Sequence, residues 1–262
     1  MFKLIYYVPV LLSLSITSAI SQEEEVLKGN VKTVREISYD EVEESDEFIG
    51  REINYESVAY YNHDGKIRER LNFYDADTAF STYHYDEGKL VETHYLRRGR
   101  INDKTEFRYN SKGDLKAKVQ TNLLKDTIDF MEIYKYDEND KLNEVGVTDA
   151  KGNLKTLYKY DDAENKVECI YPWGKVKYRY DSLGREIEET VFDDKDVLVA
   201  RGFIVYEDGL VKEMYDEDPE GVVEWRVKYD YSNFDHEGNW LRKVIYKNGD
   251  VEGVVIREIE YY

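Results

Sequence analysis

Apolar and polar residues alternate over short runs of this chain, and the alternation predicts β-strands rather than helices. In the run KVKYRYD at 175–181, Val176, Tyr178 and Tyr180 fall on one face of a strand and charged residues fall on the other. Turn sequences recur about every 12 residues, which leaves strands of roughly six to eight residues with no helix-period segment between them. We therefore predict an all-β protein, an antiparallel β-meander of repeated hairpins.

A tyrosine-turn phrase recurs along most of the chain, for example YHYDEGKL at 83–90 and YRYDSLGREI at 178–187. Its second tyrosine or the equivalent residue falls at 61, 85, 109, 136, 160, 180, 206 and 231, a loose period near 24 residues. Self-similarity of this kind indicates that one supersecondary unit is stacked repeatedly. The repeat tyrosines that we expect to form a packing ladder are Tyr85, Tyr109, Tyr136, Tyr160, Tyr180 and Tyr231.

The turns follow a spacing of Asp or Asn at the first position and Gly at the fourth. Gly at the fourth position can take the positive φ that joins a type I turn to the returning strand. Asp208-Gly209 and Asn248-Gly249 are two-residue equivalents. The structural turn residues predicted in this way are Asn62 with Gly65, Asn110 with Gly113, Asp149 with Gly152, Asp181 with Gly184, Asp218 with Gly221, and Asp235 with Gly238.

One apolar, aromatic face is too extensive to be left exposed to water, so the sheet should curl around it, fold into two layers or cover it with a partner. We favour curling, which gives a long curled sheet, because twist accumulates over many strands. The segment from Leu27 to Tyr61 reads as a longer-stranded hairpin that would cap the first open edge. The predicted organisation is a signal peptide at 1–21, an N-terminal capping hairpin at 22–54 and a YD-repeat β domain at 55–262.

The first 21 residues combine one cation, Lys3, with an apolar run from Leu4 to about Ile16 and a small-residue exit. These are the parts of a secretory signal. We expect cleavage after Ser21 and an exported chain located in the periplasm, on the cell surface or outside the cell.

The chain carries 56 acidic against 37 basic side chains, a formal charge of −19. Long-range repulsion makes nucleic acid an unfavourable partner. An outer-membrane barrel is set aside because Glu258 and Glu260 would face lipid and the strands fall short of the ~9 to 11 residues required. The prediction is a protein that is not an integral membrane protein.

The repeated Y-x-Y-D-x-x-G-K/R-L/I phrase resembles the YD repeats of the RHS family, over roughly residues 55–262. The closing segment from Tyr229 resembles the last units of small secreted RHS-like proteins of Bacteroidetes type. In large members of the family such repeats wind into a hollow β-shell around a toxin cargo. This chain is too short to enclose such a cargo, so the resemblance implies an architecture and no activity.

No catalytic cluster stands out, and we predict no cofactor and no metal site. His84 and His94 flank one turn, but an idealised hairpin places them out of register. Cys169 is the single cysteine, which excludes an intramolecular disulfide and favours an ordinary strand residue. Acidic turns such as Asp216-Glu217-Asp218 could hold Ca²⁺ incidentally. The candidate ligand platform consists of Trp173, Trp225 and Trp240.

The repeat accounts for most distinctive residues, so the leading hypothesis is a non-enzymatic secreted or cell-envelope protein that binds or scaffolds through a sheet face. Its partner would be an envelope protein or a glycan. The alternatives are a periplasmic immunity or inhibitor protein for a basic toxin, and a glycan-binding or glycan-hydrolysing protein.

Overall fold

The computed structural model describes residues 27–40, 52–74 and 77–262, and these form one antiparallel sheet of 18 strands. The signal peptide predicted at 1–21 and the turn of the predicted capping hairpin, within 41–51, lie outside the described residues. The strands are β1 (Val31–Asp40), β2 (Glu52–Tyr61), β3 (Ile67–Tyr74), β4 (Asp77–Asp86), β5 (Lys89–Arg97), β6 (Arg100–Tyr109), β7 (Leu115–Asn122), β8 (Thr127–Tyr136), β9 (Leu142–Thr148), β10 (Leu154–Tyr160), β11 (Lys166–Tyr171), β12 (Gly174–Tyr180), β13 (Glu186–Asp193), β14 (Leu198–Glu207), β15 (Leu210–Glu217), β16 (Val223–Phe234), β17 (Trp240–Lys247) and β18 (Asp250–Tyr261).

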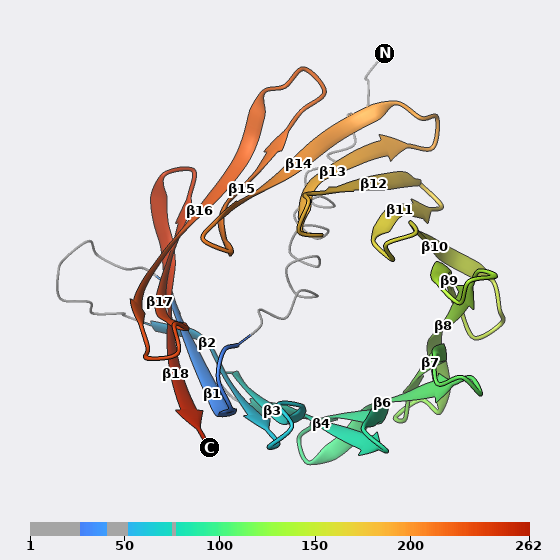
Figure 1. The fold of residues 1–262 in the computed structure, drawn as a ribbon, viewed down its shortest axis with the longest axis horizontal. Helices are drawn as coiled ribbons and strands as arrows, with labels where there is room; N and C mark the ends of the chain where they lie inside the picture. The colour runs from blue at the N-terminus through green and yellow to red at the C-terminus, as the bar shows by residue number, and fades with distance from the viewer. Residues whose placement is uncertain (1–26, 41–51, 75–76) are drawn as a thin grey trace.

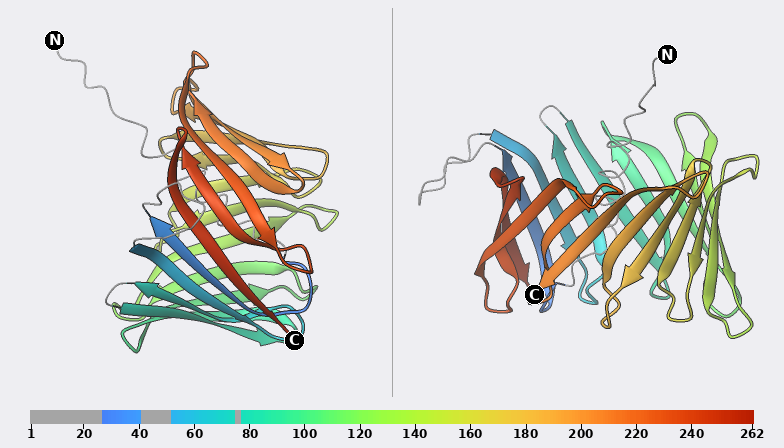
Figure 2. Two further views of the ribbon diagram at one scale, coloured as in Figure 1. Left: turned by 90° about the vertical axis from the view of Figure 1, so that its left-hand side faces the viewer. Right: turned by 90° about the horizontal axis from the view of Figure 1, so that it is seen from above.

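The sheet closes on itself. Each strand pairs with the next along the chain, and β1 pairs with β2 on one side and with β18 on the other. The register of the closing pair runs from Val31 opposite Tyr261 to Asp40 opposite Gly253. Figure 1 shows the resulting ring of strands seen along the barrel, and Figure 2 shows that the strands are tilted across its wall. Tilt and stagger of this kind are what closing a sheet into a barrel requires.

A β-bulge recurs at one end of the barrel, directly before five of the six repeat tyrosines, all except Tyr231. The register shifts between Arg108 and Tyr109, between Lys135 and Tyr136, and between Arg179 and Tyr180. Bulges bend a strand and increase its local twist, so a repeated bulge curves the sheet in the same sense at each hairpin. We call this end of the barrel the tyrosine rim. It holds the turns that follow the even-numbered strands, from the β2–β3 turn to the β16–β17 turn.

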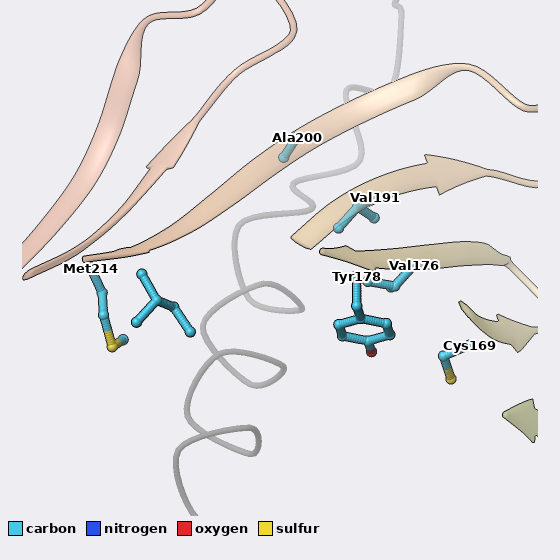
Figure 3. Packing of buried hydrophobic residues seen from close by; sticks show 7 residues of the cluster. Cys169, Val176, Tyr178, Val191, Ala200 and Met214 are labelled. Carbon is cyan, nitrogen blue, oxygen red and sulfur yellow. The ribbon is translucent and has the colours of Figure 1, made fainter. Parts of the chain in front are cut away.

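The apolar face of the sheet points into the lumen. A buried cluster on β11 to β15 contains Cys169, Val176, Tyr178, Val191, Ala200, Ile204 and Met214. Figure 3 shows the labelled members of this cluster projecting from one side of the ribbon, the side that faces the interior in Figure 1. The luminal core is therefore the aromatic and apolar face that the alternation in 175–181 predicted.

The antiparallel meander of hairpins is confirmed, whereas the long curled sheet is corrected to a closed barrel. The hairpin expected to cap an open edge has no such edge to cover, because β1 and β2 are part of the wall. The strands are six to 12 residues long, whereas six to eight were predicted. Backbone pairing continues past the tyrosine-turn phrases toward the turns. Closure satisfies the backbone groups that an edge strand would leave unpaired.

Candidate functional site

The repeat tyrosines line the lumen at the tyrosine rim, and their hydroxyls bridge neighbouring hairpins. The Tyr109 hydroxyl donates to the Leu90 carbonyl at 2.7 Å, and the Tyr136 hydroxyl donates to the Leu115 carbonyl at 2.8 Å. Leu115 lies beyond the last paired residues of β7 and β8, so the tyrosine replaces a missing ladder bond. The same type of bond joins Tyr85 to Ile67, Tyr180 to Lys166 and Tyr231 to Val211, whereas Tyr160 makes no such bond to another described residue.

The predicted turn residues occupy hairpin turns at both ends of the barrel. In the turn from Asp181, a carboxylate oxygen accepts from the backbone N–H groups of Leu183 and Arg185, and Gly184 has φ +79°. Backbone bonds close the equivalent turns at Asn62 with Gly65, Asn110 with Gly113, Asp149 with Gly152, Asp218 with Gly221, and Asp235 with Gly238. The spacing rule missed three turns of the same geometry, in which Asp140, Glu164 and Asp196 take the positive φ.

A pocket of about 1350 Å³ opens on the luminal side of the tyrosine rim, between β10 and β17. Its aromatic lining consists of Tyr160, Tyr180, Tyr206, Tyr229, Tyr231, Phe234 and Trp240. Its cations are Lys28, Lys166, Arg185 and Lys243, and its acids are Glu164, Glu186 and Asp208. Four cations against three acids give this pocket a net positive charge in a chain whose formal charge is −19. We call it the rim pocket.

Three of the four cations of the rim pocket, Lys166, Arg185 and Lys243, lie over aromatic rings. The Lys166 ammonium is 4.1 Å from the centroid of the Tyr178 ring, and the Arg185 guanidinium is 4.4 Å from that of Tyr206. Arg185 is also paired with Asp181, whereas Lys166 has no carboxylate partner among the recorded ion pairs of the described residues. Lys166 is therefore a cation held by ring faces on an aromatic wall, a setting suited to a ligand that is partly apolar and carries negative charge.

The three tryptophans do not form one platform. Trp240 is only 2% exposed and lies in the rim pocket, with the Arg257 guanidinium 3.6 Å from its ring centroid. Trp173 sits in a turn at the opposite end of the barrel and stacks on Tyr171 at 4.8 Å. Trp225 packs on the luminal core. Of the three residues, Trp240 is the one that lines the rim pocket.

Two acids are buried on the luminal wall, and neither was predicted to lie there. Glu189 on β13 is 2% exposed and Asp216 on β15 is 9% exposed. The sequence predicts an acidic turn at Asp216, but Asp216 pairs with Trp225 in the β15–β16 ladder. The alternation that places Met214 in the core would have placed Asp216 on the same face, so the signal was present in the sequence.

A smaller pocket of about 260 Å³ on β4 to β7 has a polar lining that includes Tyr83, Tyr95, Thr105, Asp103 and Gln120. Burial, reinforced by the charge of Asp129, raises the pKa of Asp103. The lumen therefore has two chemically different walls, an aromatic and cationic one along β10 to β17 and a hydroxyl-rich one along β4 to β7.

His84 and His94 lie close together on one hairpin, and Cys169 is buried. His84 pairs opposite Glu92 and His94 opposite Thr82, and the two ring centroids are 5.0 Å apart. The bulge before Tyr85 brings them closer than an idealised hairpin predicted. In residues 27–40, 52–74 and 77–262 no group of three His, Cys, Asp or Glu side chains could hold a metal ion. Burial raises the pKa of the Cys169 thiol to about 11, which makes it a poor nucleophile.

The outer wall carries charged residues with apolar side chains among them. Cross-strand ion pairs on this wall join Arg35 to Glu258, Lys135 to Glu144, Lys159 to Glu168, and Arg179 to Glu188. Neighbouring outward positions are apolar, as in the row that joins Leu71, Phe80 and Leu96. No helix in the described part of the chain has the length and apolar character needed to cross a bilayer.

No protein-family model and no curated protein matches the chain. Among solved structures, a porin-like protein from Bacteroides uniformis is 11% identical with a TM-score of 0.47, over 89% of this chain and 99% of that one. A porin-like protein from Bacteroides vulgatus is 12% identical with a TM-score of 0.33, over 88% and 98% of the two chains. The complex TcdB2-TccC3-Cdc42 is 12% identical with a TM-score of 0.35, over 80% of this chain and 14% of that one.

Two expectations are corrected. The assignment to the RHS family is wrong, because the strands close into an 18-stranded barrel and no family model supports it. The exclusion of an integral membrane protein is also wrong. It presumed an open sheet of six- to eight-residue strands, whereas the sheet is a closed barrel with strands of up to 12 residues. At these identities and TM-scores, activity and ligand have to be inferred from the lumen of this chain.

Proposed function

We propose that this chain is a non-enzymatic barrel protein of the cell envelope that binds, inside its lumen, a ligand with an apolar body and an anionic group. The observation that carries the proposal is the aromatic rim pocket, where Lys166 lies over the Tyr178 ring and has no carboxylate partner among the described residues. Ligand sites combine such a concave, largely apolar wall with a few polar groups that fix orientation.

The size and chemistry of the rim pocket fit a ligand larger than a single metabolite. Its volume of about 1350 Å³ exceeds the ~300 to 1000 Å³ of ordinary small-molecule pockets. Rings offer the apolar contact area, and Lys166 and Lys243 offer positive charge on the same wall. An anionic amphiphile would satisfy both.

The binding test uses 1-anilinonaphthalene-8-sulfonate, which joins an aromatic body to one sulfonate. We expect saturable fluorescence enhancement with a stoichiometry near one, and an affinity reduced about tenfold, or ~1.4 kcal/mol, in Lys166→Met. N-phenyl-1-naphthylamine, which lacks the sulfonate, should bind more weakly and should not respond to Lys166→Met.

The matched control is Lys177→Met, because Lys177 also lies over a ring, that of Phe192 at 5.9 Å, but on the outer wall. Equal losses in the two variants, or enhancement that never saturates, would refute a luminal anion site. Cell fractionation tests the location: we expect the chain in the envelope, and recovery with the cytosolic proteins would contradict this part of the proposal.

Glycan binding is a second candidate, favoured by the hydroxyl-rich wall on β4 to β7. Tyr83 and Tyr95 offer ring faces beside Thr105, Gln120 and Asp103, a combination that suits sugar rings and their hydroxyls. In titrations with soluble oligosaccharides, binding should then be weakened in Tyr83→Ala and unchanged in Lys166→Met. The immunity-protein and hydrolase alternatives stay predictions.

A further inference from the structure

A row of five residues crosses the luminal wall from β12 to β16. Tyr178 pairs opposite Glu189, Glu189 opposite Gly202, Gly202 opposite Asp216, and Asp216 opposite Trp225. Paired residues point to the same face of a sheet, and Figure 3 shows Tyr178 projecting to the luminal side. The row therefore reads aromatic, acid, glycine, acid, aromatic.

Gly202 leaves the space between the two acids without a side chain. Glu189 and Asp216 are two strand spacings apart, roughly 10 Å between their backbones, and both side chains can lean into the gap over Gly202. An aromatic residue closes each end of the row, Tyr178 beside Glu189 and Trp225 beside Asp216.

Apolar residues flank this row on both sides. The adjacent row toward one end of the barrel is Val176, Val191 and Ala200. The adjacent row toward the tyrosine rim is Ile204, Met214 and Val227. A carboxylate in such surroundings incurs a desolvation cost that hydrogen-bond donors, a proton or a cation can offset.

Asp216 shows the clearest unmet requirement. It is 9% exposed, and its Oδ1 has no hydrogen-bond partner among the described residues. Burial, with the negative charges of Glu189 and Glu224, raises the pKa of Asp216 to about 7. A buried acceptor without a donor costs ~1 to 3 kcal/mol, so a ligand that brings a donor and a positive charge would remove two penalties together.

We propose that Glu189 and Asp216 form a luminal receptor for a primary ammonium group, with Tyr178 and Trp225 as the aromatic sides of the site. A primary ammonium brings three N–H donors and one positive charge, and ring faces attract the same cation. The site goes beyond the anion-binding function proposed for the rim pocket, since its two acids, Glu189 and Asp216, do not line that pocket and its ligand carries the opposite charge.

The test is isothermal titration with n-hexylammonium and with hexyltrimethylammonium at pH 8, above the raised pKa of Asp216. The two probes share a charge and an apolar chain, but only the first donates hydrogen bonds. We expect saturable binding of hexylammonium and at least tenfold weaker binding of the trimethyl analogue. Asp216→Asn and Glu189→Gln should each weaken hexylammonium binding at least tenfold.

Controls separate loss of the site from loss of the fold. Asp230→Asn removes an outward carboxylate that pairs with Lys212, and it should leave hexylammonium binding unchanged. Each luminal variant should retain anilinonaphthalene sulfonate binding at the rim pocket, which also keeps failure of the two proposals distinguishable. Absence of saturable hexylammonium binding up to about 10 mM, equal binding of the two probes, or unchanged binding in Asp216→Asn would overturn the proposal.

Discussion

The hydroxyl of Tyr136 is expected to stabilise the barrel by bridging two hairpins, and Tyr136→Phe tests this directly. The substitution keeps the half-buried ring and removes one bond of 2.8 Å to the Leu115 carbonyl. Leu115 lies past the end of the β7–β8 ladder. In the variant its carbonyl therefore loses its hydrogen-bond partner, unless water takes the place of the tyrosine hydroxyl. A neutral hydrogen bond of this kind contributes about 1 kcal/mol net.

Equilibrium urea unfolding and thermal unfolding should both report the loss. We expect the free energy of unfolding to fall by about 1 kcal/mol and the Tm to fall by roughly 2 to 4 °C. Tyr109→Phe, which removes the equivalent bond to Leu90, should give a similar loss, and the two losses should add.

The matched control is Tyr160→Phe, because Tyr160 occupies the same register without a recorded hydroxyl bond in the described part of the chain. If Tyr136→Phe costs no more than Tyr160→Phe, the hydroxyl bridges do not stabilise the barrel and the tyrosine phrase acts through its rings alone. An unchanged urea m-value would show that the comparison concerns stability and not a different unfolded state.

Two further predictions concern a turn and a buried acid. Gly184→Val should lower the free energy of unfolding by about 1 to 2 kcal/mol, because valine at φ +79° is strained although the nearest atom, Asn165 Oδ1, is 3.9 Å from the added Cβ. Leu183→Val in the same turn is the control, and wild-type stability in Gly184→Val would refute the turn assignment. For Asp216, the folded state retains its proton from the ordinary pKa of 3.8 up to about 7, so unfolding releases a proton in this window. The free energy of unfolding of the wild type, relative to that of Asp216→Asn, should therefore fall as pH rises from 4 to 7. The neighbouring acids Glu189 and Glu224 contribute to the raised pKa. A constant difference between the two proteins over that range would contradict the raised pKa.

Local patterns predicted the hairpins because their determinants lie within a few residues. Alternation in 175–181 assigned the two faces of β12, and Asp181 accepts from two backbone N–H groups of its own turn. The same locality explains the failures. The three turns with Asp140, Glu164 and Asp196 at positive φ lack the glycine on which the spacing rule depends.

The candidate sites were harder to predict because each depends on the exact pairing register of two or more strands. The pairing of Glu189 and Asp216 across Gly202 depends on the registers of β13, β14 and β15 together. The rim pocket combines residues from Lys28 to Lys243. The bulge before Tyr85 shifts the register of one hairpin by a residue. This shift is enough to bring the rings of His84 and His94, which were predicted to be out of register, to a centroid distance of 5.0 Å.

The sequence alone determined the all-β class, the hairpin repeat and the division into an aromatic face and a charged face, because alternation and turn chemistry are local properties. Only the tertiary structure decided that the sheet closes. Closure requires β1 to meet β18, with Val31 opposite Tyr261, and this pairing depends on twist, tilt and bulges accumulated over all 18 strands. No single repeat contains that sum, so the lumen and the sites in it became visible only when the strands were assembled.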